Sequence, residues 1–456
     1  MIEGLNSAVA TAKKQFLKSD SLENLGDFHI IESLSNLLHS DTWGADQMDF
    51  YHAWMKKLDI AKTHFKVYLN NWKPAPEKLL LDEGCYRLSI LLAIRYLSSL
   101  SASKDEFGQT MKTSNVVFKV LNRVDGVFGL KNELIKESIQ NLLNRFQPIK
   151  RQASQLLEEK ETIEKVLPIT VLFSEGPIAR AYLETINGMG LKVKKVIQLV
   201  SSLDLVSKKP VGKFLPSSMR VSYAASKQYK QMFFWSNQMK QKLSDDVKAT
   251  QQAVQDAFGI NQQILSAATQ EQSLTRYSDC VEQLMITGLK DIVLLEKMQQ
   301  EQSEFFLFTG GGIVPDSLLK IGNKKLIHVH PGYLPDVRGA DCVLWSQLIY
   351  GRTSASAFFL APGIDVGDVI LPFWLPDLKL KVSKTTDLKF QYRLIYGFLD
   401  PWVRSFVLKQ LIVLTDGFKQ INSTPQNQHM GQTYHFMHEE TKRVAVSQFQ
   451  SKGLEN

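Results

Sequence analysis

Two histidines and an aspartate have types and spacing suited to proton transfer. His328 and His330 alternate near the end of an apolar run, 325–329, that predicts a β-strand, and the period of two puts both side chains on one face. A Pro-Gly turn follows, which places His330 near the carboxyl end of the strand, where open α/β sheets bind ligands. Asp365 follows the next predicted strand, in a turn between two glycines. A histidine and a carboxylate at neighbouring strand ends can act as a proton-transfer pair.

Ordinary structural roles are the alternative for each of these residues. A histidine near a strand end is commonly a satisfied polar residue, and an aspartate in a glycine-rich turn is commonly a turn former. His328 and His330 on one face could also chelate zinc, but no third ligand is evident in the sequence, so we expect no metal site. The combination of the three residues, rather than any one of them, favours a catalytic site.

A β-α-β pattern must position these residues. The apolar, β-branched run 168–173 predicts a buried strand, 178–189 an amphipathic helix and 193–200 a second strand. This is the building unit of a Rossmann-like α/β fold, a doubly wound and mostly parallel sheet. The same patterns predict further elements, which are strand 305–308, helix 316–321, strand 325–329, helix 342–350 and strand 354–360.

Composition shifts divide the chain into three regions. Residues 1–165 contain almost no proline and have helical apolar spacing, which predicts an all-α N-terminal domain of unknown role. Residues 166–376 are expected to form the catalytic domain, with a mainly helical insertion at about 225–303. Residues 377–456 are expected to form a C-terminal helical extension and tail, with one long apolar helix over 389–414.

The overall composition excludes several protein classes. The 456 residues are 44% hydrophobic, which excludes wholesale disorder, and three cysteines far apart exclude a disulfide framework. No apolar run is long enough for a membrane span and the N-terminus does not resemble a signal peptide, so we expect a cytoplasmic protein with no membrane partner. The net charge of +8 does not by itself favour nucleic acid as a partner, and the basic run 208–230 is interpreted as a solvated loop.

Several motifs together resemble the folate-dependent formyltransferase family. They are His328-Val329-His330-Pro331-Gly332-Tyr333-Leu334-Pro335, Arg338-Gly339, Trp345, Gly363-Ile364-Asp365-Val366-Gly367 and, upstream, Gly310-Gly311-Gly312-Ile313-Val314-Pro315. The resemblance covers roughly 167–376 and does not cover the first 165 residues. It implies a Rossmann-like fold and an enzyme of one-carbon metabolism, a transferase that moves a formyl group from 10-formyltetrahydrofolate to an amine in a biosynthetic process.

The resemblance also implies roles for particular residues. His330 matches the catalytic histidine and Asp365 the catalytic aspartate, whereas His328 stands where the family has an asparagine that donates to the formyl oxygen. An imidazole can also donate one hydrogen bond, depending on its tautomer or protonation. Two segments match those that enclose the folate with backbone hydrogen bonds, and their residues are Gly310, Gly311, Gly312, Ile313, Val314, Ala361, Pro362, Gly363 and Ile364.

Because His328 stands in place of the asparagine, three interpretations are open. The chain is an active formyltransferase with an altered triad, an enzyme that uses another one-carbon or acyl donor, or a folate-binding or partner-binding protein with impaired catalysis. Hydrolysis of 10-formyltetrahydrofolate, with water as acceptor, is a further alternative.

The sequence also constrains the acceptor. In the turn 174–177, Glu175 would repel a phosphate and Pro177 lacks an N–H, which favours a small-molecule amine. A protein partner could bind through 1–165. The tail 431–438 resembles an element that closes some family members, and we expect it to pack at the sheet edge near the site.

Overall fold

The computed structural model describes Met111 and residues 149–158, 163–381, 383, 386–427 and 431–449. The chain divides into two compact units, of which one comprises Pro148–Tyr434 and Ala445–Asn456. The sheet and the candidate site described below belong to that unit. The predicted N-terminal helical domain lies outside the described residues, apart from Met111 and the short stretches 149–158 and 163–165, so the domain boundaries and its role stay predictions.

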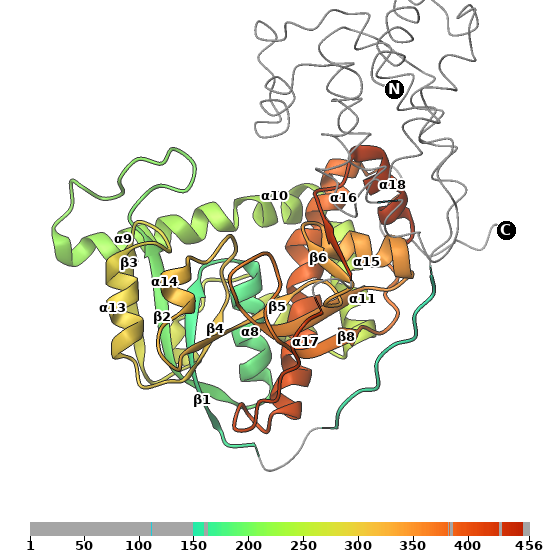
Figure 1. Ribbon diagram of the computed structural model, residues 1–456. Coiled ribbons are helices and arrows are strands. Elements are labelled where there is room, and N and C mark those ends of the chain that lie inside the picture. The colour runs from blue at the N-terminus through green and yellow to red at the C-terminus, as the bar shows by residue number, and fades with distance from the viewer. Residues whose placement is uncertain are drawn as a thin grey trace, which may run out of the picture. The chain divides into compact units, whose positions relative to one another are not determined.

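A seven-stranded sheet is the centre of this unit (Figure 1). The strand order is β3-β2-β1-β4-β5-β7-β8. The first five strands run parallel, and β7 and β8 are antiparallel to their neighbours. The mostly parallel sheet confirms the predicted Rossmann-like α/β class. The strands are β1 (Val166–Ser174), β2 (Lys192–Ser201), β3 (Val281–Ile286), β4 (Phe305–Phe308), β5 (Lys325–His330), β7 (Ser354–Phe359) and β8 (Val369–Trp374).

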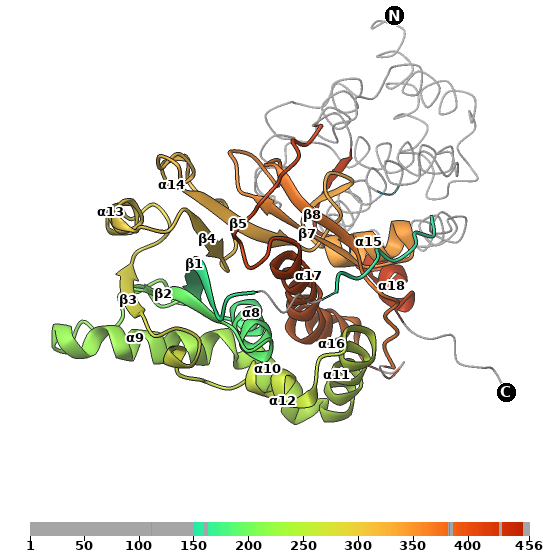
Figure 2. The same ribbon diagram turned by 90° about the horizontal axis from the view of Figure 1, so that it is seen from below.

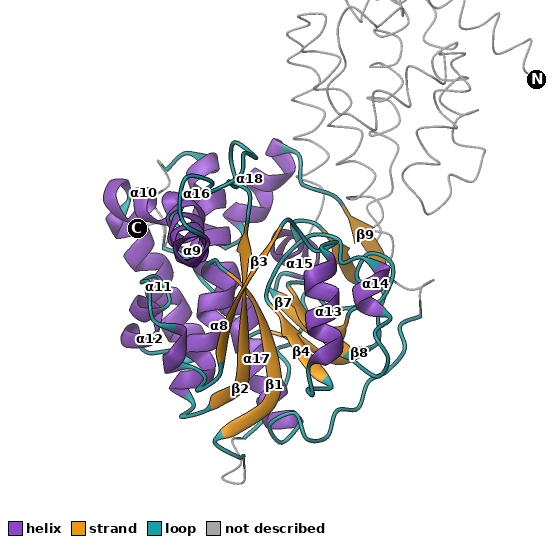
Figure 3. Ribbon diagram, turned by 90° about the vertical axis from the view of Figure 1, so that its left-hand side faces the viewer, coloured by secondary structure: helices purple, strands orange, loops and turns teal. Residues whose placement is uncertain are grey.

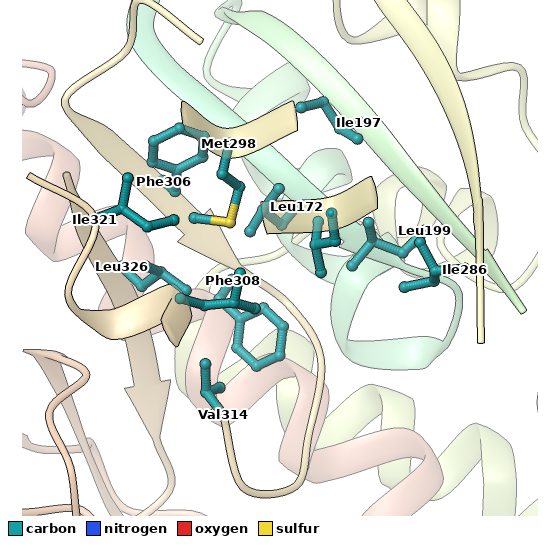
Figure 4. Close-up of a cluster of buried hydrophobic side chains, with 12 residues drawn as sticks. Leu172, Ile197, Leu199, Ile286, Met298, Phe306, Phe308, Val314, Ile321 and Leu326 are labelled. Atoms are coloured by element: carbon teal, nitrogen blue, oxygen red, sulfur yellow. The ribbon is translucent and has the colours of Figure 1, made fainter. Parts of the chain in front are cut away.

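Helices cover both faces of the sheet (Figure 2). On one face lie α13 (Ile292–Gln300) and α14 (Asp316–Leu319), and on the other lie α8 (Pro177–Gly188) and α17 (Asp400–Leu414), which pack against each other. Burial of apolar side chains, at about 1.5–3 kcal/mol for each large one, holds these layers together. The cluster under α13 and α14 contains Leu172, Ile197, Leu199, Ile286, Leu294, Met298, Phe306, Phe308, Val314, Leu318, Ile321 and Leu326 (Figure 4).

The stretch 225–303, predicted to be mainly helical, also contains a strand. Its helices are the end of α9 (Ser217–Met232), then α10 (Phe234–Lys242), α11 (Ser244–Phe258) and α12 (Gln262–Ala267), followed by a 3-10 turn and β3. The interpretation of this whole range as an insertion was therefore wrong for β3, which is the edge strand of the sheet beside β2. Glu282 and Gln283 give β3 a polar pattern that hides it, as only one of its two edges is paired.

The predicted long helix, 389–414, is three consecutive helical segments. It consists of α16 (Leu388–Leu394), a π-helical segment η4 (Ile395–Leu399) and α17. π-segments interrupt α-helices and occur often at functional sites. Within the described residues, no helix is long and apolar enough to cross a membrane.

A second, two-stranded sheet lies beside the central one (Figure 3). It pairs β6 (Val337–Gly339) with β9 (Gln432–Tyr434) in parallel, and α18 (Glu439–Ser447) follows β9. The Tyr434 ring stacks on Trp345 of α15 (Cys342–Tyr350), with centroids 4.7 Å apart. A side chain at Gly339 (φ +98°) would place its Cβ 2.2 Å from the carbonyl oxygen of Tyr434, so only glycine permits this pairing.

Candidate active site

The alternation of β5 sets the direction of the two histidines. Leu326 packs in the core under α13 and α14, and His328 and His330 follow it at intervals of two, so all three point to that face of the sheet. His330 is buried, with 4% of its surface exposed, whereas His328 is partly exposed. Both histidines therefore lie on one face of β5, as the alternation in the sequence predicts.

His328 donates through one ring nitrogen. Its Nδ1 lies 3.1 Å from the carbonyl oxygen of Phe308, and because a carbonyl can only accept, we assign the proton to Nδ1. Burial, followed by the positive charge of Arg404, lowers the pKa of His328 to about 4, so the ring is neutral at neutral pH. Nε2 then carries a lone pair. In this tautomer His328 accepts a hydrogen bond at Nε2 and cannot donate one there.

His330 lies between two oxygen atoms. Its Nε2 is 3.1 Å from the carbonyl oxygen of Val337, and its Nδ1 is 3.5 Å from Oδ2 of Asp365. Burial lowers the pKa of His330, while the Asp365 carboxylate acts in the opposite direction. At 3.5 Å the Nδ1–Oδ2 pair is at the outer limit of a hydrogen bond, so a small approach would let the carboxylate share a proton with the ring.

The turn after β5 leaves no room for a side chain at Gly332. A Cβ there would lie 2.3 Å from the carbonyl oxygen of Val337 and 2.9 Å from Nε2 of His330. The backbone of Gly332 therefore packs directly against the hydrogen bond that fixes the imidazole. This close approach gives a physical reason for glycine in the His-Pro-Gly sequence.

The sequence does not indicate how the loop after β7 brings Asp365 close to His330. The sequence places the two residues at neighbouring strand ends, but β7 is antiparallel to β5, and its last residue, Phe359, pairs with Ile327. The loop after β7 must therefore fold back toward His330. Asp365 adopts a left-handed backbone (φ +55°), and a Cβ at Gly367 would lie 1.8 Å from the Phe359 carbonyl oxygen.

Two further contacts fix the aspartate. The backbone N–H of Gly339 donates to Asp365 Oδ2 at 3.0 Å. The side-chain amide of Gln426 donates to the carbonyl oxygens of Asp365, at 2.9 Å, and Gly367, at 2.6 Å. Gln426 lies 61 residues beyond Asp365 in the sequence, and no local pattern marked it.

Arg404 approaches β5 from the opposite side and was also missed by the sequence analysis. Its Nη1 donates to the carbonyl oxygen of Val329 at 3.0 Å, between the two histidines in sequence, and its Nε donates to both carboxylate oxygens of Asp400 at 3.0 and 3.1 Å. Asp400 is 2% exposed. A charged pair four residues apart within an apolar helix was a signal, because buried charges need a specific partner.

A nearby thiol does not add a nucleophile. Burial raises the pKa of Cys342 well above its ordinary value, and the carboxylate of Asp365 adds to this rise. The thiol is therefore protonated at neutral pH, and a protonated thiol is a poor nucleophile. The chemistry of the site depends on imidazole and carboxylate groups.

The two predicted folate-binding segments have groups available for a ligand. A Cβ at Gly311 or Gly312 would meet no atom within 4 Å, and Ile313 is 85% exposed, whereas Val314 is buried in the core and anchors the loop. Among the described residues, no hydrogen bond to the backbone of 310–314 is found. In the second segment, which contains Ala361, Pro362 and Gly363, Ile364 is 54% exposed. Free backbone donors and acceptors fit recognition of a flat heterocycle, so the residues present fit a folate.

Comparison with known proteins points to one family. No family model matches the chain. A curated methionyl-tRNA formyltransferase from Syntrophus aciditrophicus is 33% identical over 87 residues, which are 18% of this chain and 28% of that protein. This chain resembles the formyltransferases. The chain therefore spans little more than a quarter of the curated relative that it matches.

Solved formyltransferase structures are also similar at low identity. Phosphoribosylglycinamide formyltransferase from Streptococcus pneumoniae TIGR4 is 14% identical, with 54% of this chain and 96% of that chain covered and a TM-score of 0.28. A 4-N formyltransferase from Francisella tularensis is 8% identical, with 63% and 90% covered and a TM-score of 0.32. Glycinamide ribonucleotide transformylase 1 from Symbiobacterium toebii is 13% identical, with 60% and 100% covered and a TM-score of 0.30.

The turn after β1 carries its own buried ion pair. Glu175 Oε1 accepts hydrogen bonds from the Gly176 N–H at 3.1 Å and from Arg180 Nε at 3.0 Å, and Oε2 accepts from Arg180 Nη2 at 2.7 Å. Arg180 Nη1 donates to the carbonyl oxygen of Gln272. Both charged side chains are almost fully buried. The N–H and the positive charge at the start of α8 are thus satisfied by a carboxylate of the chain itself.

Proposed function

We propose that this protein transfers a formyl group from 10-formyltetrahydrofolate to the amine of a small-molecule acceptor. The observation that carries the proposal is the pairing of His330 with Asp365 at 3.5 Å in an α/β sheet whose motifs resemble those of formyltransferases. The loop segments 310–314 and 361–364 would hold the folate through their backbones. The cytoplasmic location expected from the sequence stays a prediction.

The folate supplies an activated formyl group, and the residues of the chain manage protons and charge around it. We infer that Nδ1 of His330, beside Asp365, takes up the proton of the attacking amine, and that the imidazolium formed at this stage stabilises the negative charge on the formyl oxygen. After the amine attacks, the same pair would take part in moving its proton to the departing nitrogen of the donor. Arg404, which binds the Val329 carbonyl, would hold β5 and both histidines in register.

His328 has a different part in this proposal from the asparagine it replaces. With its proton on Nδ1, it would accept a hydrogen bond from the attacking amine and turn the amine's lone pair toward the formyl carbon. It would not supply an oxyanion donor, and the absence of one such donor typically costs about 10²–10³ in rate. We therefore expect formyl transfer by this chain to be slow.

The ion pair in the first turn bears on the acceptor. Glu175 accepts hydrogen bonds from the Gly176 N–H and from Arg180, the two groups that could otherwise attract an anion. A phosphate in this turn would therefore meet a carboxylate. We infer that the acceptor carries no phosphate at this position. An amino sugar, an amino acid or a hydroxylamine has the required chemistry.

Hydrolysis of the donor to formate is a second candidate. It is favoured by the lone pair on Nε2 of His328, because this nitrogen can accept a hydrogen bond from water as readily as from an amine. A folate-binding protein with impaired catalysis is a third candidate. It is favoured by the hydrogen bond between Nε2 of His330 and the Val337 carbonyl, because this nitrogen is then not available to the formyl group.

One assay separates these candidates. The purified full chain would be given 10-formyltetrahydrofolate with pools of small amines, and release of tetrahydrofolate would be followed together with the gain of one formyl group in mass. Transfer predicts a formylated amine, at a rate lowered at least about 100-fold in His330→Ala and Asp365→Asn. Asp279→Asn is the control, because Asp279 is largely exposed and pairs with surface Lys192. Formate without a formylated amine would establish the hydrolase, and no release at all would refute both reactions.

A further inference from the structure

One segment carries the entire net charge of the chain. Residues 205–243 contain eight basic residues and no aspartate or glutamate, whereas the net charge of all 456 residues is +8. Basic and acidic residues are therefore equal in number over the rest of the chain. The eight are Lys208, Lys209, Lys213, Arg220, Lys227, Lys230, Lys240 and Lys242.

The same segment exposes large apolar side chains. Of the fifteen exposed large hydrophobic residues in the described part of the chain, seven fall within these 39 residues. The two most exposed of these seven, Val206 at 80% and Phe214 at 77%, lie in the loop before α9, next to lysines. The seven are Val206, Phe214, Met219, Tyr223, Met232, Phe234 and Trp235.

The loop is held in a defined conformation. Arg220 Nε and Nη2 donate to the carbonyl oxygens of Gly212 and Leu215, each at 3.2 Å, and the Phe214 ring packs edge-on against Tyr223 with centroids 5.8 Å apart. Asp204, just before the loop, accepts from the N–H groups of 206 and 207 at 2.9 and 2.7 Å. The loop lies beside α9 (Figure 1, light green). Apolar exposure at Val206 and Phe214 is thus a built feature of the surface.

α9 continues this surface along one of its faces. Met219 and Tyr223 are four residues apart, and Lys230 is seven beyond Tyr223, which puts all three on the same side of the helix. All three are exposed. We call the exposed side chains of the loop 206–214 together with Met219, Tyr223 and Lys230 the basic apolar surface.

We propose that the basic apolar surface binds peripherally to a lipid bilayer that contains acidic lipids. Lysines beside exposed apolar side chains are the combination that such interfaces select, because the apolar groups enter the boundary between headgroups and acyl chains while the ammonium groups contact anionic lipid. The sequence had predicted no membrane partner because no segment can span a bilayer, but binding of this kind needs no span.

Nucleic acid would also attract the charge, but it fits the apolar residues less well. Bases stack on open aromatic faces, whereas Val206 and Met219 have none. The ring of Trp235 already holds the guanidinium of Arg393, 3.5 Å from its centroid, and the Phe214 ring is packed against Tyr223. These observations favour lipid over nucleic acid.

Co-sedimentation of the full chain with vesicles tests the proposal. We expect binding to vesicles of phosphatidylcholine with phosphatidylserine, weak or no binding to phosphatidylcholine alone, and weaker binding at high salt. The triple variant Lys208→Gln/Lys209→Gln/Lys213→Gln should weaken binding about 100-fold, at about fivefold for each lysine. Val206→Ser/Phe214→Ser should weaken it roughly tenfold or more.

Matched variants control for non-specific effects. Ile292→Ser/Val293→Ser removes two exposed apolar side chains of α13, and Lys248→Gln removes an exposed charge of α11; both should leave vesicle binding unchanged. Circular dichroism would verify that each variant is folded. Equal binding to neutral vesicles, binding to none, equal loss in the control variants, or displacement from acidic vesicles by a short single-stranded RNA would overturn the proposal.

Discussion

Two histidines on one strand face have opposite hydrogen-bonding roles. The ring of His328 donates through Nδ1 to Phe308 and leaves an acceptor at Nε2, while the ring of His330 has an oxygen atom near each nitrogen. The groups around each ring, rather than the shared side-chain type, decide whether its second nitrogen can take up a proton. The sequence could place both rings on one face, but the carbonyl of Phe308, which fixes the tautomer, comes from another strand.

Substitution of His328 should change how stability depends on pH. Its pKa of about 4 in the folded chain lies below the ordinary value of about 6.5, so between these pH values the unfolded chain binds more protons. The free energy of unfolding should therefore fall as pH drops from about 6.5 to 4, by about 3 kcal/mol from this group.

Urea denaturation across this pH range would measure the effect. In His328→Asn the group no longer titrates, so the variant should lose less stability than the wild type between pH 6.5 and 4. Above pH 7 the wild-type ring is neutral, and the pH dependence of the two proteins should run parallel. Curves that run parallel throughout the acid range would show that the pKa of His328 is not lowered by folding.

At the scale of single elements, the turn after β5 matters most to the site. Gly332→Ala would force a Cβ to within 2.3 Å of a backbone oxygen, so the turn must move and the bond from His330 to Val337 must change. We expect a loss of about 1–3 kcal/mol in the free energy of unfolding and a lower rate of tetrahydrofolate release.

Gly288→Ala is the matched control for that substitution. A Cβ at Gly288 meets no atom within 4 Å, so this change should be neutral or stabilise by less than about 1 kcal/mol. Urea denaturation and the release assay on both variants would decide the matter. Wild-type behaviour of Gly332→Ala in both measurements would show that this turn does not position His330.

The elements that were predicted correctly share a physical property. Apolar, β-branched runs such as β1 and β2 are buried on both faces of a parallel sheet, and burial is what the pattern reports. β3 is polar because it is an edge strand, and β8 contains Pro372, which argues against a strand and is tolerated here because β8 is the opposite edge. The contribution of Gln426 could not be predicted, because long-range folding alone brings it to Asp365. The spacing of Asp400 and Arg404 indicated a buried ion pair, but not the contact of Arg404 with β5.

At the scale of the whole molecule, a buried arginine links segments that are distant in the sequence. Glu175 and Arg180 join the end of β1 to the start of α8, and the same guanidinium binds the carbonyl of Gln272, 92 residues further along the chain. The excess of basic over acidic residues, by contrast, falls within 205–243.

Glu175→Gln should destabilise the whole fold. The amide keeps the size of the carboxylate but leaves a buried guanidinium without its counter-charge, and breaking one partner of such a pair costs about 3–5 kcal/mol. Glu282→Gln removes a carboxylate that is 37% exposed beside Lys195 and Lys297, so it should cost at most about 1 kcal/mol. Urea denaturation of the two variants at equal ionic strength measures the difference. Equal losses would mean that water reaches the Glu175–Arg180 pair.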